Sequence, residues 1–192
     1  MLYTAAFLGR EREFREESLE RLGLTAGEQV LEIGCGRGNS LQAIRHAVGP
    51  DGTVVGLDLS QGMIRAARDR IQRRQWQNVH VCLADVRRPP IRHQSMDAAY
   101  AGMSLSAVTD PTQVIQAVKR ILRPGGRFVV LDARPFRAFP WALINPLVTP
   151  VAKRTTNWVP EVDIVAVLRR EFERVDVTSF NGGSIVILVA EC

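Results

Sequence analysis

VLEIGCGRGNS, residues 30–40, is the most informative stretch of this 192-residue chain. An apolar strand ends there in three glycines at alternate positions, Gly34, Gly36 and Gly38. Glu32 lies inside the strand just before them. Glycine adopts positive φ without strain and lets the backbone approach a ligand closely. A strand that runs through such a turn into a helix is typical of a cradle for a nucleotide-like group.

The composition indicates a single soluble domain over residues 1–192. Hydrophobic residues make up 46% and charged residues 23%, which is ordinary for a globular protein. The net charge of +5 permits anionic partners such as phospholipid or RNA without selecting one. Three scattered cysteines without C-x-x-C spacing favour a reducing cytoplasm and predict no metal site. We see neither a signal peptide nor an apolar run of about 18 residues that could span a membrane.

Strands and helices alternate along most of the chain. Apolar runs predict strands at about 29–34, 53–60, 78–84, 95–103 and 127–133. Helical periodicity and capping residues predict helices at 10–22, at 38–48, from Ser60 through Ile71, and from Asp110 through Leu122. This alternation predicts a parallel sheet with helices on both faces. RVDVTSF and IVILVAE flank the turn NGGS as a hairpin, so one of these last two strands must run antiparallel.

The glycine spacing narrows the choice of ligand. A dinucleotide fold would need a glycine at Asn39, and a phosphate-binding P-loop would need G-K-[ST]. Asp58 ends the second strand, where a carboxylate can accept both hydroxyls of a ribose. Asp85 follows the third strand and is placed to accept from an exocyclic amine such as that of adenine. Because ligands bind at the carboxyl ends of the strands, these positions predict a nucleoside.

The chain resembles the class I S-adenosylmethionine-dependent methyltransferases over nearly its whole length. VLEIGCGRG is similar to their first motif, GLDLS to the ribose-binding segment, LADV to the adenine-side segment, and ILRPGGRFVVLD to the motif before the fifth strand. The resemblance implies a Rossmann-like, doubly wound α/β sheet of seven strands, mostly parallel with an antiparallel C-terminal hairpin strand. It implies S-adenosyl-L-methionine as cofactor, S-adenosyl-L-homocysteine as product, and cofactor contacts from Glu32, Gly34, Cys35, Gly36, Gly38, Asp58, Leu59, Met63, Ala84, Asp85, Val86 and Ala101.

Two segments carry a closer likeness. Residues 104–135 resemble the ubiquinone/menaquinone C-methyltransferases and the bacterial phospholipid N-methyltransferases, and residues 180–190 resemble the tail of the quinone enzymes. The likeness implies a small-molecule or lipid-like acceptor. The chain departs from the quinone enzymes in SLSAV, which replaces their Arg-Asn pair, and in a shorter region after the fifth strand. An RNA or protein methyltransferase, and a cofactor-binding module without transfer activity, are the alternatives.

We expect the acceptor over the ends of the fourth and fifth strands. Ser104, Ser106 and Asp132 are the candidate catalytic residues there. Transfer needs mainly alignment of the acceptor, and a base only if the acceptor carries a proton at attack. No N/D-P-P-Y signature follows the fourth strand, which disfavours the amino groups of nucleic acid bases. Nucleic acid is therefore not an expected partner, and the sequence indicates no oligomeric state.

Residues 134–160 form a proline-rich insert. It holds five of the ten prolines and two of the three tryptophans, a density that argues against a long helix. A connection of this length is usually functional. Its aromatic, apolar and basic residues permit three interpretations, namely core cover, a lid over a hydrophobic substrate, or a surface that contacts an anionic membrane. These residues are Phe136, Phe139, Trp141, Leu143, Trp158, Arg134, Arg137, Lys153 and Arg154. We favour the lid, with a cytoplasmic location and membrane association as the closest alternative.

Overall fold

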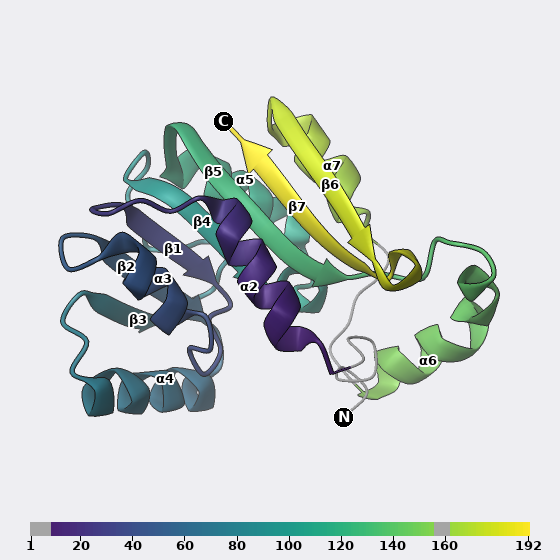
Figure 1. Cartoon of the computed structure of the whole chain (residues 1–192), viewed down its shortest axis with the longest axis horizontal. Helices are drawn as coiled ribbons and strands as arrows, with labels where there is room; N and C mark the ends of the chain where they lie inside the picture. The colour runs from purple at the N-terminus through teal and green to yellow at the C-terminus, as the bar shows by residue number, and fades with distance from the viewer. Residues whose placement is uncertain (1–8, 156–161) are drawn as a thin grey trace.

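The computed structural model describes residues 9–155 and 162–192 and contains one sheet of seven strands in the order β3-β2-β1-β4-β5-β7-β6 (Figure 1). The strands are β1 (Gln29–Ile33), β2 (Thr53–Asp58), β3 (Val79–Leu83), β4 (Met96–Gly102), β5 (Leu122–Ala133), β6 (Arg174–Phe180) and β7 (Ile185–Glu191). The first five pair in parallel, whereas β7 runs antiparallel to both β5 and β6. The predicted doubly wound sheet with an antiparallel C-terminal strand is confirmed.

The strand order reverses at β1, which pairs with β2 on one side and β4 on the other. In an open parallel sheet, ligands bind beyond the carboxyl ends of the strands at this switch point. The glycine-rich stretch follows β1 directly. The fold therefore places the loop where a ligand is expected.

Helices cover both faces of the sheet. Two apolar core clusters lie on opposite faces, one packed against α2, α3 and α4, the other against α5 and α7. The helices are α2 (Glu11–Leu22), α3 (Leu41–Val48), α4 (Gln61–Arg74), α5 (Pro111–Ile121), α6 (Asn145–Thr155) and α7 (Ile164–Glu171), with short 3₁₀ turns η1 (Leu105–Ala107), η2 (Trp141–Ile144) and η3 (Asn181–Gly183). In the described residues, no helix combines the length and apolar character needed to cross a bilayer.

The predicted caps form, but two helix boundaries differ. The side chains of Ser60 and Asp110 accept from backbone amides at the starts of α4 and α5, as predicted. The helix expected at 38–48 begins only at Leu41, because the residues before it form turns. Leu122, expected on the inner face of α5, instead begins β5 and is buried there. The Pro-Gly-Gly run after it is tolerated in a strand because the pairing of β5 with β4 shifts register here.

The expectation of no long helix in the insert is wrong for residues 145–155. Helix α6 runs for 11 residues with Pro150 inside it. Pro146 lies in the first turn, where a backbone amide has no helical partner to lose. Pro150 removes one bond to the preceding turn, which weakens the helix locally without ending it here. Trp158, named above with the insert, lies outside the described residues.

Candidate functional site

The glycine loop after β1 can be built only with glycine at its first position. Gly34, Gly36 and Gly38 all have positive φ, at +65°, +54° and +75°. A Cβ added at Gly34 would lie 2.4 Å from the Cβ of Ser104, far inside van der Waals contact. The Ser104 hydroxyl also donates to the carbonyl oxygen of Ile33 at 2.7 Å. Ser104 therefore packs against the loop at Gly34, and its hydroxyl proton is already donated to the Ile33 carbonyl.

Asp58 fixes the other side of the loop. One carboxylate oxygen accepts from the Gly36 amide and the other from the Ser60 amide, each at 2.8 Å. These bonds orient the half-buried carboxylate at the end of β2. Each carboxylate oxygen has two acceptor positions, so both oxygens retain capacity for a pair of ligand hydroxyls. The geometry suits the ribose role that the sequence predicts for Asp58.

Glu32 is a buried ionisable residue with an unusual environment. Its side chain is 3% exposed, and its Oε2 is a buried polar atom with no hydrogen-bond partner among the described residues. Burial raises the pKa of the Glu32 carboxyl from 4.5 to about 8, against the opposing effects of a hydrogen bond with Ser40 and the charge of Arg15. A buried carboxyl with an unused oxygen is rare because desolvation is costly. It suits a cationic ligand group that would supply the missing partner.

A tyrosine and two serines that the sequence analysis missed surround Glu32. Tyr100 pairs in register with Glu32 across β1 and β4, and its hydroxyl shares a 2.8 Å hydrogen bond with Ser18 of α2. Burial raises the pKa of Tyr100 to about 12. Ser40 interacts with both Glu32 and Tyr100. The sequence did offer one signal for Tyr100, because it is the only residue with a phenolic hydroxyl in the apolar strand β4.

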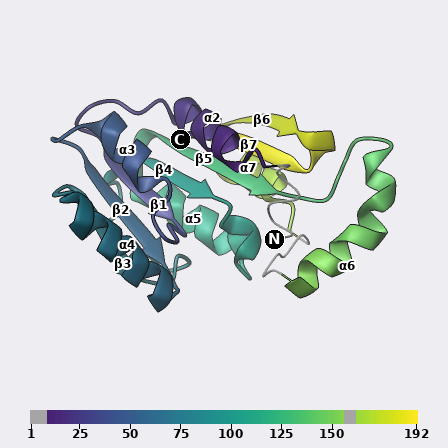
Figure 2. The same cartoon turned by 60° about the horizontal axis from the view of Figure 1, so that its bottom comes forward.

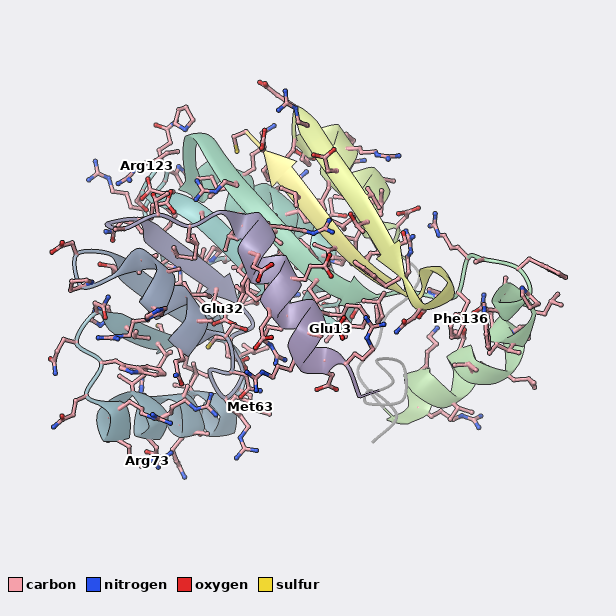
Figure 3. All side chains as sticks on the ribbon, viewed as in Figure 1. Glu13, Glu32, Met63, Arg73, Arg123 and Phe136 are labelled. Atoms are coloured by element: carbon pink, nitrogen blue, oxygen red, sulfur yellow. The ribbon has the colours of Figure 1, made fainter. Side chains whose placement is uncertain are left out.

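An exposed apolar surface borders Asp58. Leu59, Met63 and Leu83 are 69%, 41% and 47% exposed, which is unusual for large apolar side chains. Leu83 pairs in register with Asp58, so both point to the same face of the sheet. Figure 3 shows Met63 between α4 and α2 in this view, below Glu32. These side chains can pack against a flat ring. The sequence analysis expects Leu59 and Met63 to contact the cofactor but does not name Leu83.

Asp85 occupies the expected place but is not free to accept. Its two oxygens take a backbone and three side-chain hydrogen bonds from Arg87, at 2.6 to 3.1 Å. These bonds lower the pKa of Asp85 to about 2. A ligand amine must therefore compete with Arg87 for this carboxylate. Of the other predicted contacts, Ala84 donates its amide to the Asp58 carbonyl at 3.0 Å, and Val86, Ala101 and Cys35 are buried.

The remaining catalytic candidates, Ser106 and Asp132, are hydrogen-bonded to each other. Asp132 is 1% exposed and accepts from the backbone amides of Ser106 and Ala133, each at 2.8 Å, and from the Ser106 hydroxyl. Burial raises the pKa of Asp132. This arrangement fixes the turn after β4 against the end of β5. A role for either residue as a base stays a prediction.

A cavity of about 300 Å³ opens beside this pair. Its walls come from the end of β5, the start of the insert, the start of α7 and β7, with Ser106, Asp132, Arg134, Phe136, Asp163 and Val186 among the lining residues. Turn η1 lies next to both the cavity and the glycine loop, because Ser104 just before it packs against Gly34 and Ser106 within it lines the cavity. The volume is at the lower end of the range for small-molecule sites.

Comparison with known proteins agrees with this geometry. A family model described as a methyltransferase domain matches residues 24–174. The chain is 30% identical over 123 residues to a demethylmenaquinone methyltransferase of Geobacillus, covering 64% of this chain and 53% of that protein. It is 31% identical over 154 residues to a 2-phytyl-1,4-naphtoquinone methyltransferase of Trichormus variabilis, covering 77% and 67%. The chain thus spans about half the length of the first of these relatives.

A solved structure shows the same fold. The crystal structure of a SAM-dependent methyltransferase from Aquifex aeolicus superposes with a TM-score of 0.73 at 20% identity, covering 92% of this chain and 88% of that one.

Proposed function

We propose that this chain, which belongs to the family of methyltransferase domains, transfers a methyl group from S-adenosylmethionine to a small hydrophobic or lipid-like acceptor. The observation that carries the proposal is the constellation of the glycine loop, the unpartnered oxygen of Glu32 and the oriented carboxylate of Asp58. The three features lie on two neighbouring strand ends.

The residues present fit the cofactor. The glycine loop leaves open space at Gly36, where an added Cβ would meet no atom within 4 Å. Glu32 can bind the ammonium of the methionine part, which would supply the partner that its Oε2 lacks. Asp58 can accept the ribose hydroxyls, and Leu59, Met63 and Leu83 can cover the adenine ring. When bound, the cofactor supplies a methyl group that is already electrophilic on a positively charged sulfur.

The contribution of the chain is then mainly alignment. A fixed loop and a fixed Asp58 hold the donor in one position, and holding two reactants in line is worth several orders of magnitude in rate. Ser104 acts through the loop as a positioning residue, because its side chain sets the path of Gly34. Ser106 and Asp132 border the acceptor cavity, where they can orient a polar group of the acceptor.

The hydrophobic acceptor is supported from two sides. Both quoted relatives carry names of enzymes that act on quinone-type molecules. The insert adds Phe136 to the cavity wall and exposed apolar side chains beyond it. Contact of this insert with a membrane would give a lipid-like acceptor a direct route to the cavity.

The test is transfer of isotope-labelled methyl from S-adenosylmethionine into a fractionated cell extract. We expect label in the organic-solvent phase, and at least tenfold less with Asp58→Asn when S-adenosylmethionine is well below saturation. Label confined to precipitable polymer would instead establish an RNA or protein acceptor. Cofactor binding measured separately, without label in any fraction, would contradict transfer and favour a module that only binds.

A further inference from the structure

The insert carries most of the exposed large hydrophobic side chains among the described residues. Among the described residues, six of the nine exposed large hydrophobic side chains lie between residues 139 and 151. We call this set the apolar arm, which consists of Phe139, Trp141, Leu143, Leu147, Val148 and Val151. Phe139, Leu147 and Leu143 are 83%, 74% and 69% exposed. Exposed apolar residues in one contiguous segment mark an interaction surface, whereas scattered ones need no explanation.

The arm is held in place at its base. The amides of Arg137 and Ala138 both donate to the carbonyl of Gly182, at 3.1 and 3.0 Å, in the turn between β6 and β7. Asn145 binds both backbone groups of Phe136, at 2.9 and 2.8 Å, and so closes the loop onto the start of α6. Beyond this base, α6 stands away from the sheet in both views (Figures 1 and 2). The apolar side chains are therefore presented on a defined projection.

The segment that carries the arm has charged side chains of one sign only. Residues 134–155 contain four basic residues and no acidic one. Arg137 forms an ion pair with Asp163 at 2.9 Å. Lys153 and Arg154 lie in the last turn of α6, and both are exposed. Exposed aromatic and aliphatic side chains flanked by basic residues match the boundary between headgroups and acyl chains of an anionic bilayer.

We propose that the apolar arm docks this protein on the surface of an anionic lipid bilayer, with Phe139, Leu143 and Leu147 entering the acyl boundary and Lys153 and Arg154 meeting the headgroups. Phe136 at the base of the arm lines the cavity described above. Docking would therefore bring that cavity to the membrane surface. Vesicle binding requires no cofactor, so docking can be measured separately from methyl transfer.

The experiment is co-sedimentation of the full chain with vesicles of phosphatidylcholine alone or with added phosphatidylglycerol. We expect binding to the anionic vesicles and little to the neutral ones. Phe139→Ala with Leu147→Ala removes exposed apolar area without opening a cavity in the core, and should weaken binding at least tenfold. Lys153→Gln with Arg154→Gln should weaken it about 30-fold, since each basic residue near an anionic surface is worth on the order of fivefold.

A matched control separates the arm from general electrostatics. Arg73→Gln with Arg74→Gln makes the same change in net charge in the last turn of α4. Figure 3 shows Arg73 and Phe136 at opposite ends of the molecule. We expect wild-type binding from this control. The proposal would be overturned if both charge variants lost binding equally, or if the Phe139/Leu147 variant bound vesicles as wild type does. It would also be overturned if the chain did not bind vesicles but sedimented as a dimer that the Phe139/Leu147 variant abolishes.

Discussion

Glu32→Gln is the substitution with the most distinctive expected result. Burial raises the pKa of Glu32 to about 8, so the carboxyl is mostly protonated at pH 7. Binding of an ammonium group favours the carboxylate, so cofactor binding must release this proton. Well below that pKa, affinity should therefore rise about tenfold per pH unit, for example between pH 6 and pH 7. The rise should level off near pH 8, where the ligand's own amino group begins to lose its proton.

The glutamine variant should remove this dependence. A neutral amide has no proton to release, so its affinity should change little between pH 6 and pH 7. At pH 7.5 it should bind more weakly than wild type by about threefold or more, because a hydrogen bond to a charged group is worth about 1.5–3 kcal/mol and about a quarter of the wild-type carboxyl is ionised at that pH. Calorimetric titration of S-adenosylmethionine at four pH values measures both effects. Glu20→Gln, an exposed position on α2, is the control.

The same carboxyl makes a prediction for stability. The folded state raises the pKa of Glu32 from 4.5 to about 8, so the unfolded chain loses this proton first as pH rises. Its contribution to the free energy of unfolding is thus largest below pH 4.5 and falls between pH 4.5 and 8, by up to about 5 kcal/mol. Glu32→Gln should therefore be more stable than wild type at pH 8 and similar at pH 5. Affinity independent of pH in wild type, together with equal melting temperatures at pH 8, would refute the reasoning.

Three further substitutions test the parts around Glu32. Gly34→Ala should lower the free energy of unfolding by more than about 1 kcal/mol through its clash with Ser104, and Gly36→Ala by less, since only positive φ opposes it; chemical denaturation compares them, and equal losses would contradict the clash. Arg87→Ala should keep or increase cofactor affinity by freeing Asp85, with little effect on stability because both side chains of the pair are more than one third exposed; a lower affinity in calorimetric titration would show instead that Arg87 helps binding. Tyr100→Phe should cost about 1 kcal/mol of unfolding free energy by removing the bond to Ser18; a Ser18→Ala double variant that loses the sum of both effects would argue against that bond.

The sequence carries the fold because its strongest signals are local. The glycine spacing after Glu32 and the acid at Asp58 lie in strand–turn–helix units, whose residues are close along the chain. The hairpin around Gly182 fixes the antiparallel direction of β7 through a short turn. Such features need no knowledge of the rest of the molecule.

What the sequence did not reveal depends on distant or competing contacts. Ser18 and Tyr100 are 82 positions apart, and only the packing of α2 on β4 brings their hydroxyls together. Ser104 was a candidate base, but the fold turns its side chain against Gly34. The predicted acceptor role of Asp85 did not take account of Arg87, which lies two residues away and donates hydrogen bonds to the same carboxylate oxygens.

The most direct test of the account is calorimetric titration of S-adenosylmethionine into the wild-type chain, Asp58→Asn and Asp51→Asn. Asp51 is an exposed residue just before β2, so Asp51→Asn removes the same charge away from the site and serves as the control. We expect binding by wild type and Asp51→Asn, and at least tenfold weaker binding by Asp58→Asn, because a charged acceptor for the ribose hydroxyls is lost. Absence of binding in the wild-type chain, or an Asp58→Asn variant that binds as wild type does, would contradict a cofactor site at the ends of β1 and β2.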